Sequence, residues 1–75
     1  MDRLTALQVF IAVVEQGSLS AGAERLDMSR AMVTRYLAEL ERWMGARLLH
    51  RTTRRQSLTT AGEEALRYAR QMVAL

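Results

Sequence analysis

Residues 18–44, SLSAGAERLDMSRAMVTRYLAELERWM, decide the fold of this 75-residue chain. The stretch begins with two serines and continues into the small residues 21–23, which predicts a short capped helix with Ser20 as the favoured N-cap. Because alanine and glycine have almost no side chain, another helix can approach this one closely. Asp27 and Met28 then interrupt the pattern as a tight break.

A longer helix follows the break. Ser29 supplies a fresh N-cap, and the helix is predicted from Arg30 to about Met44, where Gly45 ends it. Apolar residues recur four, three and four positions apart, which is the spacing of one buried helix face. That face consists of Val33, Leu37, Leu40 and Met44. The outward positions of the helix are therefore free to meet a ligand.

Together these parts meet the requirements of a helix-turn-helix unit. Ala23 is small enough to sit where the two helices cross, and Met28 supplies an apolar plug for the corner. Leu26 and Val33 close the core beneath the turn. Asp27 stands where this turn often has glycine, but aspartate tolerates the left-handed conformation better than most residues.

Segments on both sides complete the unit. Helical periodicity covers Leu4–Gln16, with Asp2 as a candidate N-cap and Gly17 as the stop. Beyond the central unit the period changes, and residues 47–51 and 56–59 are predicted to pair as two short strands. The result would be a hairpin, or wing, beside the helix-turn-helix.

The chain closes with one more helix. Thr59 or Thr60 caps it, and Glu63 completes a possible capping box with Thr60. We therefore expect a mainly α fold: a winged helix-turn-helix of three helices and a two-stranded wing, followed by a long C-terminal helix. The expected division is a DNA-binding unit at 1–58 and a linker or dimerisation helix at 59–75, as argued below.

Composition narrows the function. The chain has no cysteine and no proline, and its 11 cationic residues, all arginine, face 8 carboxylates. Five arginines fall within residues 42–58, where the nearest carboxylate is Glu41, and they are Arg42, Arg47, Arg51, Arg54 and Arg55. Guanidinium groups bind phosphates and guanine edges in a bidentate way, so this polarised charge favours a polyanion as the partner.

The whole chain resembles the N-terminal domain of LysR-type transcriptional regulators. The matching strings are LQVFIAVVEQGSLSAGAERL, SRAMVTRYLAELE and GARLLHRTTRRQSLTTAG. The last is the most specific, because the family shows a similar arginine-bearing wing followed by Leu-Thr-x-Ala-Gly. The resemblance implies sequence-specific binding of double-stranded DNA by a homodimer, in the cytoplasm and associated with the nucleoid. It also implies a downstream effector-binding domain, absent from these residues, that would take a small-molecule effector.

Carried over residue by residue, the resemblance assigns DNA contacts to the second helix of the unit and to the wing. The recognition-helix set is Ser29, Arg30, Ala31, Thr34 and Arg35, and the wing set is Arg51, Arg54 and Arg55. Many family members have glutamine and proline where this chain has Arg30 and Ala31, so its base preference differs from theirs. Ser18 and Ser20, at a helix N-terminus, are expected to bind phosphate.

Each of these residues also has an ordinary reading. Arg30 and Arg35 are five positions apart and can be solvated surface residues, as can the wing arginines. Tyr36 can contact DNA or pack against the wing. Trp43 lies beside the apolar stripe, and we expect partial burial against the wing or the last helix. His50, the only histidine, is expected to be structural.

The last helix carries more apolar residues than one side of a small domain needs. The expected dimerisation set is Ala65, Leu66, Ala69, Met72 and Val73. Such a stripe usually marks an interface, and the resemblance supplies the same helix of a second chain. The alternative is that the helix folds back onto the first helix. The pattern runs to Leu75 without a terminator, which predicts that the helix continues in a longer protein.

Other function classes fit less well. An enzyme is disfavoured because the chain has no phosphate-cradling glycine loop and no carboxylate cluster, and no cofactor or metal is expected. A small helical protein-interaction module or a self-contained antitoxin-like repressor remains as the alternative. A membrane partner is disfavoured because the arginines concentrate in a presumed hairpin and not along one helix face.

Overall fold

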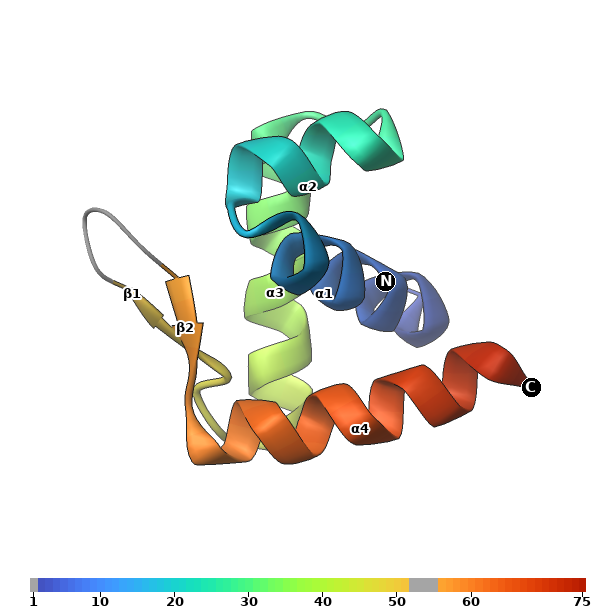
Figure 1. Cartoon of the computed structure of the whole chain (residues 1–75), viewed down its shortest axis with the longest axis vertical. Coiled ribbons are helices and arrows are strands. Elements are labelled where there is room, and N and C mark those ends of the chain that lie inside the picture. The colour runs from blue at the N-terminus through green and yellow to red at the C-terminus, as the bar shows by residue number, and fades with distance from the viewer. Residues whose placement is uncertain (1, 52–55) are drawn as a thin grey trace.

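The computed structural model describes residues 2–51 and 56–75, which contain four helices and two strands. The helices are α1 (Arg3–Gln16), α2 (Leu19–Leu26), α3 (Arg30–Met44) and α4 (Thr60–Ala74). The strands β1 (Leu49–Arg51) and β2 (Gln56–Leu58) pair antiparallel, with Leu49 opposite Leu58. In Figure 1, α3 runs upright, α2 lies at its upper end, α4 runs below it, and the hairpin projects to one side. The predicted mainly α, winged helix-turn-helix fold is confirmed.

The first helix is the element against which the other three helices pack. Its residues Val9, Phe10 and Val13 are completely buried. A helix that is apolar around most of its circumference belongs in the interior, and burying one large apolar side chain contributes roughly 1.5–3 kcal/mol. Hence α1 forms the centre of the core rather than one of its walls.

The third helix presents its predicted inner face to this core. Val33, Leu37 and Leu40 are buried, while Met44 is partly buried at the end of the helix. Leu48 and the first residue of β1 are also buried in the same cluster. The stripe therefore anchors α3 along its length and leaves the opposite side of the helix in solvent.

Most helix ends lie where the sequence predicts them. Asp2 caps α1 and Ser29 caps α3, each accepting a hydrogen bond from a backbone amide in the first turn, and Gly17 and Gly45 end these helices in the left-handed region. The prediction of Ser20 as the cap of α2 is wrong. Ser18 is the cap, and its hydroxyl oxygen accepts from the amide of Ala21 at 3.0 Å.

The start of α4 corrects a second detail. Thr59 is the N-cap, and its hydroxyl oxygen accepts from the amide of Gly62 at 2.8 Å. The capping box of Thr60 and Glu63 is therefore not formed, because the helix begins one residue earlier than that pairing needs. Thr59 is held there because its hydroxyl also donates to the carbonyl of Arg47 at 2.6 Å.

Two glycines are required by close approach. A Cβ at Gly22 would lie 2.9 Å from the Cα of Val13, where α2 crosses α1. A Cβ at Gly62 would lie 2.0 Å from the carbonyl oxygen of Leu48. That oxygen accepts from the amide of Thr59 at 3.1 Å, so α4 and the base of the wing meet at Gly62 without space for a side chain.

The fourth helix folds back against α1, the alternative that the sequence left open. Ala65, Leu66 and Ala69 are buried in the core of this chain, so these three members of the expected dimerisation set are not on its surface. Met72 and Val73, both 37% exposed, are the members that remain accessible. The stripe is longer than expected for one core because α1 supplies an apolar face on this side as well.

None of the helices in the described parts of the chain is long and apolar enough to cross a membrane.

The contact at Gly62 predicts a large loss of stability on adding one methyl group. Gly62→Ala should lower the free energy of unfolding by at least about 2 kcal/mol, since the rigid Leu48 carbonyl cannot move aside cheaply. Gly17→Ala is the matched control, because it has a positive φ but open space around the new Cβ, and it should cost only about 1 kcal/mol. Urea unfolding followed by circular dichroism measures both. Equal losses would contradict the close contact.

Candidate nucleic-acid interface

The outer face of α3 carries the residues that the sequence assigned to recognition. Ser29, Arg30, Ala31, Thr34 and Arg35 are all exposed. The hydroxyl oxygen of Ser29 accepts from the amide of Met32 at 3.1 Å, which leaves its proton free to donate. Because the opposite side of α3 is buried, this face is held at a defined orientation.

The turn before α3 sets that orientation. Asp27 adopts the left-handed conformation with φ 56° and ψ 43°, as the turn requires. The amide of Met28 donates to the carbonyl of Ala23 at 3.0 Å, and the Met28 side chain packs partly buried against the core. The chain thus reverses at a stapled corner, and α3 leaves it with its arginines outward.

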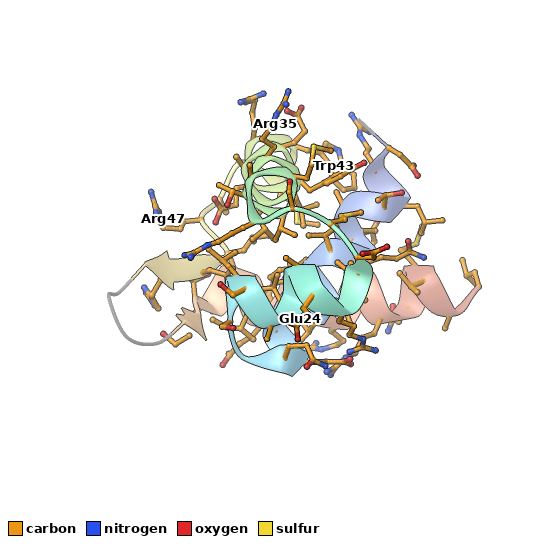
Figure 2. All side chains as sticks on the ribbon, turned by 90° about the horizontal axis from the view of Figure 1, so that it is seen from above. Glu24, Arg35, Trp43 and Arg47 are labelled. Atoms are coloured by element: carbon orange, nitrogen blue, oxygen red, sulfur yellow. The ribbon has the colours of Figure 1, made fainter. Side chains whose placement is uncertain are left out.

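Helical geometry sorts the outward residues. Ala31, Arg35 and Arg42 are four and seven positions apart, so they share one strip, roughly opposite the buried one. Figure 2 shows Arg35 pointing away from the body of the molecule, while Glu24 on α2 lies on the opposite side. Arg47 lies on the flank nearer the strands. The basic and acidic side chains are therefore separated by the fold.

The ion pairs reinforce this separation. Arg25 pairs with Glu15 at 2.8 Å, and Arg70 approaches the same carboxylate at 3.6 Å. In the parts of the chain that the structure describes, Arg30, Arg35 and Arg47 form no ion pair. Their guanidinium donors are available to an anionic partner.

The wing is joined to the helices by three hydrogen bonds at its base. The amide of Leu48 donates to a Glu41 carboxylate oxygen at 2.8 Å, which ties the approach to β1 onto α3. Thr59 supplies the other two, through its hydroxyl to Arg47 and its amide to Leu48. Arg51 closes β1, whereas Arg54 and Arg55 lie outside the described residues.

The remaining assigned residues have mixed positions. Ser18 is half-buried and uses its oxygen as the α2 cap, while Ser20 is exposed in the first turn. Tyr36 packs partly buried against the core, and His50 is exposed on β1. Trp43 does not pack on the wing or on α4, as expected. It lies against the first turn of α1, with the Arg3 guanidinium carbon 4.6 Å from its ring centroid.

Sequence reasoning counted Arg42 and Arg47 in the basic segment without giving either a place in a site. The signal for Arg42 was its seven-residue spacing from Arg35, which puts both on one helix face. Arg47 had no such signal, because it precedes a strand and its direction depends on how the wing joins α3.

Comparison with known proteins agrees with this geometry. Residues 4–63 match the family described as bacterial regulatory helix-turn-helix protein, lysR family. An HTH-type transcriptional regulator of Xanthomonas campestris pv. campestris is 50% identical over 68 residues, which are 85% of this chain and 20% of that protein. The probable regulator LtrA of Klebsiella pneumoniae is 41% identical over 73 residues, which are 97% of this chain and 24% of that protein.

Solved structures agree as well. The complex of the CbnR DNA-binding domain with DNA matches with a TM-score of 0.92 and 39% identity, over 99% of this chain and 84% of that one. The fold and the exposed arginine face define a winged helix-turn-helix DNA-binding domain of a transcription regulator, not an enzyme. The chain belongs to the LysR family. It spans between a fifth and a quarter of the length of the two curated relatives named above.

Proposed function

We propose that this chain is the sequence-specific DNA-binding part of a homodimeric bacterial transcription regulator, with α3 in the major groove and the wing in the adjacent minor groove. The observation that carries the proposal is the outer face of α3, where Arg30 and Arg35 are exposed and have no carboxylate partner among the described residues. The DNA complex of the similar CbnR domain supports the same partner.

The residue types on α3 suit base edges. An α-helix fits the major groove, which is about 12 Å wide. Arg35 lies near the centre of the outward strip and has the fork geometry to bind guanine O6 and N7. Ala31 and Thr34 are small enough to bring the helix close to a thymine methyl, and Arg30 in the first turn reaches a base or a phosphate.

Backbone contacts would hold α3 in register. Ser18 and Ser20 lie at the start of α2, where hydroxyls and free amides attract phosphate. Arg51, Arg54 and Arg55 are assigned to the minor groove by the family resemblance, and the firm base of the wing at Thr59 supports that role.

Dimerisation would use α4, through a surface that differs from the expected one. Tyr68 and Met72 are 42% and 37% exposed, and with Leu75 they follow four- and three-residue spacing along one strip. Val73 faces the other way, into a groove with Ile11 and Leu26. We therefore assign the contact between protomers to Tyr68, Met72 and Leu75.

The relatives are several times longer than this chain, so the regulator we propose has a further domain. That domain would bind a small-molecule effector, and the complete protein would act in the cytoplasm on the nucleoid. Residues 1–58 and 59–75 would then act as the DNA-binding unit and the linker helix.

DNA binding through several arginines predicts a steep salt dependence. The affinity for duplex DNA should fall at least about a thousandfold between 50 and 200 mM salt, from counterion release at about six or more phosphates in the dimer. Fluorescence anisotropy of a labelled duplex measures this. A flat salt response, or no binding at the lowest salt, would contradict the proposed function and favour a protein-interaction module.

Base readout by Arg35 predicts a loss of specificity. Arg35→Ala should cost about 1–3 kcal/mol on a duplex selected from a random pool, and less on a scrambled duplex of the same composition. Arg25→Ala is the control, because Arg25 pairs with Glu15 away from α3. Equal losses on both duplexes would reduce Arg35 to a phosphate contact.

The α4 strip predicts self-association that an acidic side chain disrupts. Met72→Glu should leave the chain monomeric at concentrations where the unmodified chain dimerises, because it would bury a charge without a partner in the interface. Ala74→Glu adds the same side chain on the opposite exposed side of α4 and should not change the assembly. Sedimentation equilibrium separates the two, and the same shift in both variants would rule out this strip.

A further inference from the structure

An arginine–tryptophan cluster lies on the flank of α3 away from the wing and has no role in the contacts above. The Arg3 guanidinium stacks over the ring of Trp43, which is 37% exposed. Both residues line a surface groove between the first turn of α1 and the last turns of α3, with Arg42 and Glu39 on its rim. The cluster thus presents two guanidinium groups around one exposed aromatic ring.

Helical geometry relates this cluster to the recognition face. From Arg35 the positions Glu39, Arg42 and Trp43 turn progressively toward α1, while Glu41 turns toward the wing, where its carboxylate accepts from Leu48. Figure 2 shows Arg35 and Trp43 on the same upper side of the molecule, with Arg47 on the other flank of α3. The recognition face therefore has a basic group on each of its flanks.

We propose that Arg3 and Arg42 bind the sugar–phosphate backbone on the side of the major groove opposite the wing, with Trp43 as the platform that aims Arg3. This inference rests on the proposed insertion of α3 into the major groove. A helix about 10–12 Å wide fills that groove, so both of its flanks come close to a phosphate backbone. The wing serves one flank, and this cluster serves the other.

The two carboxylates in the groove do not cancel this charge. Asp2 accepts hydrogen bonds from the Leu4 amide at 3.2 Å and from the Thr5 hydroxyl at 2.5 Å. These bonds, that of Thr5 above all, hold the pKa of Asp2 below its ordinary value, so it is a satisfied anion that faces its own helix. Within the described residues, Arg3 forms no ion pair with a carboxylate.

Arg42 is restrained without being consumed. One of its nitrogens donates to Glu39 at 2.8 Å, while 73% of its side chain remains exposed. A guanidinium has five N–H donors, so the pair with Glu39 leaves others for a phosphate. Arginine held by an aromatic ring or a neighbouring carboxylate also loses less rotamer freedom when it binds.

The first test uses Trp43, the only tryptophan of the chain, as a probe. Saturating duplex DNA should shield it from the neutral quencher acrylamide, so the quenching constant falls on complex formation. Anisotropy of the labelled duplex reports binding in the same sample. Binding without any shielding of Trp43 would overturn this inference and leave the proposed function standing. No binding at low salt would overturn both.

The second test compares variants that each remove one positive charge. Arg3→Gln and Arg42→Gln should each make the slope of log affinity against log salt shallower by about one per protomer, equally on selected and scrambled duplexes. Arg25→Gln is the matched control and should leave the slope unchanged. Arg3→Lys should restore the slope, because a phosphate contact needs the charge. If Arg3→Gln and Arg42→Gln behave like Arg25→Gln, the cluster does not touch DNA. Thermal unfolding confirms that each variant is folded.

Discussion

The packing of α1 inside the molecule is the constraint on which the rest of the structure depends. Val9, Phe10 and Val13 are completely buried, and α2, α3 and α4 each pack against this helix. A domain of this size buries only roughly 60% of its unfolded surface, so one helix that serves three neighbours uses its apolar area economically. The orientation of the recognition face follows from this arrangement, because α3 is seated on α1 by its inner stripe.

Close approach between elements gives the arrangement its accuracy. Gly22 allows α2 to lie directly on Val13, and Gly62 allows the start of α4 to lie on the Leu48 carbonyl. The second contact matters for function, because Thr59 beside it bonds to both Arg47 and Leu48. The base of the wing is thereby tied to α4, while the Glu41 carboxylate ties it to α3. A change in the direction of α4 would be felt at the wing.

Electrostatics then divides the molecule into two sides. The carboxylate of Glu15 gathers Arg25 and Arg70 on the side of α1, α2 and α4. The arginines of α3 have either no carboxylate partner among the described residues or, for Arg42, one that leaves most of the side chain exposed. Exposed ion pairs of this kind add little stability. Their consequence is that the cations left for a polyanion lie around one helix face.

The sequence by itself determined the elements, the inner face of α3, the left-handed Asp27 and the exposure of the recognition residues, because these depend on local periodicity and capping. Only the tertiary structure decided between Ser18 and Ser20 and between Thr59 and Thr60, since each pair offers equivalent capping hydroxyls and the choice depends on contacts with distant residues. It also placed Ala65, Leu66 and Ala69 in the core and Trp43 beside Arg3. Periodicity shows that a face is apolar, but which neighbour covers that face depends on how the helices cross.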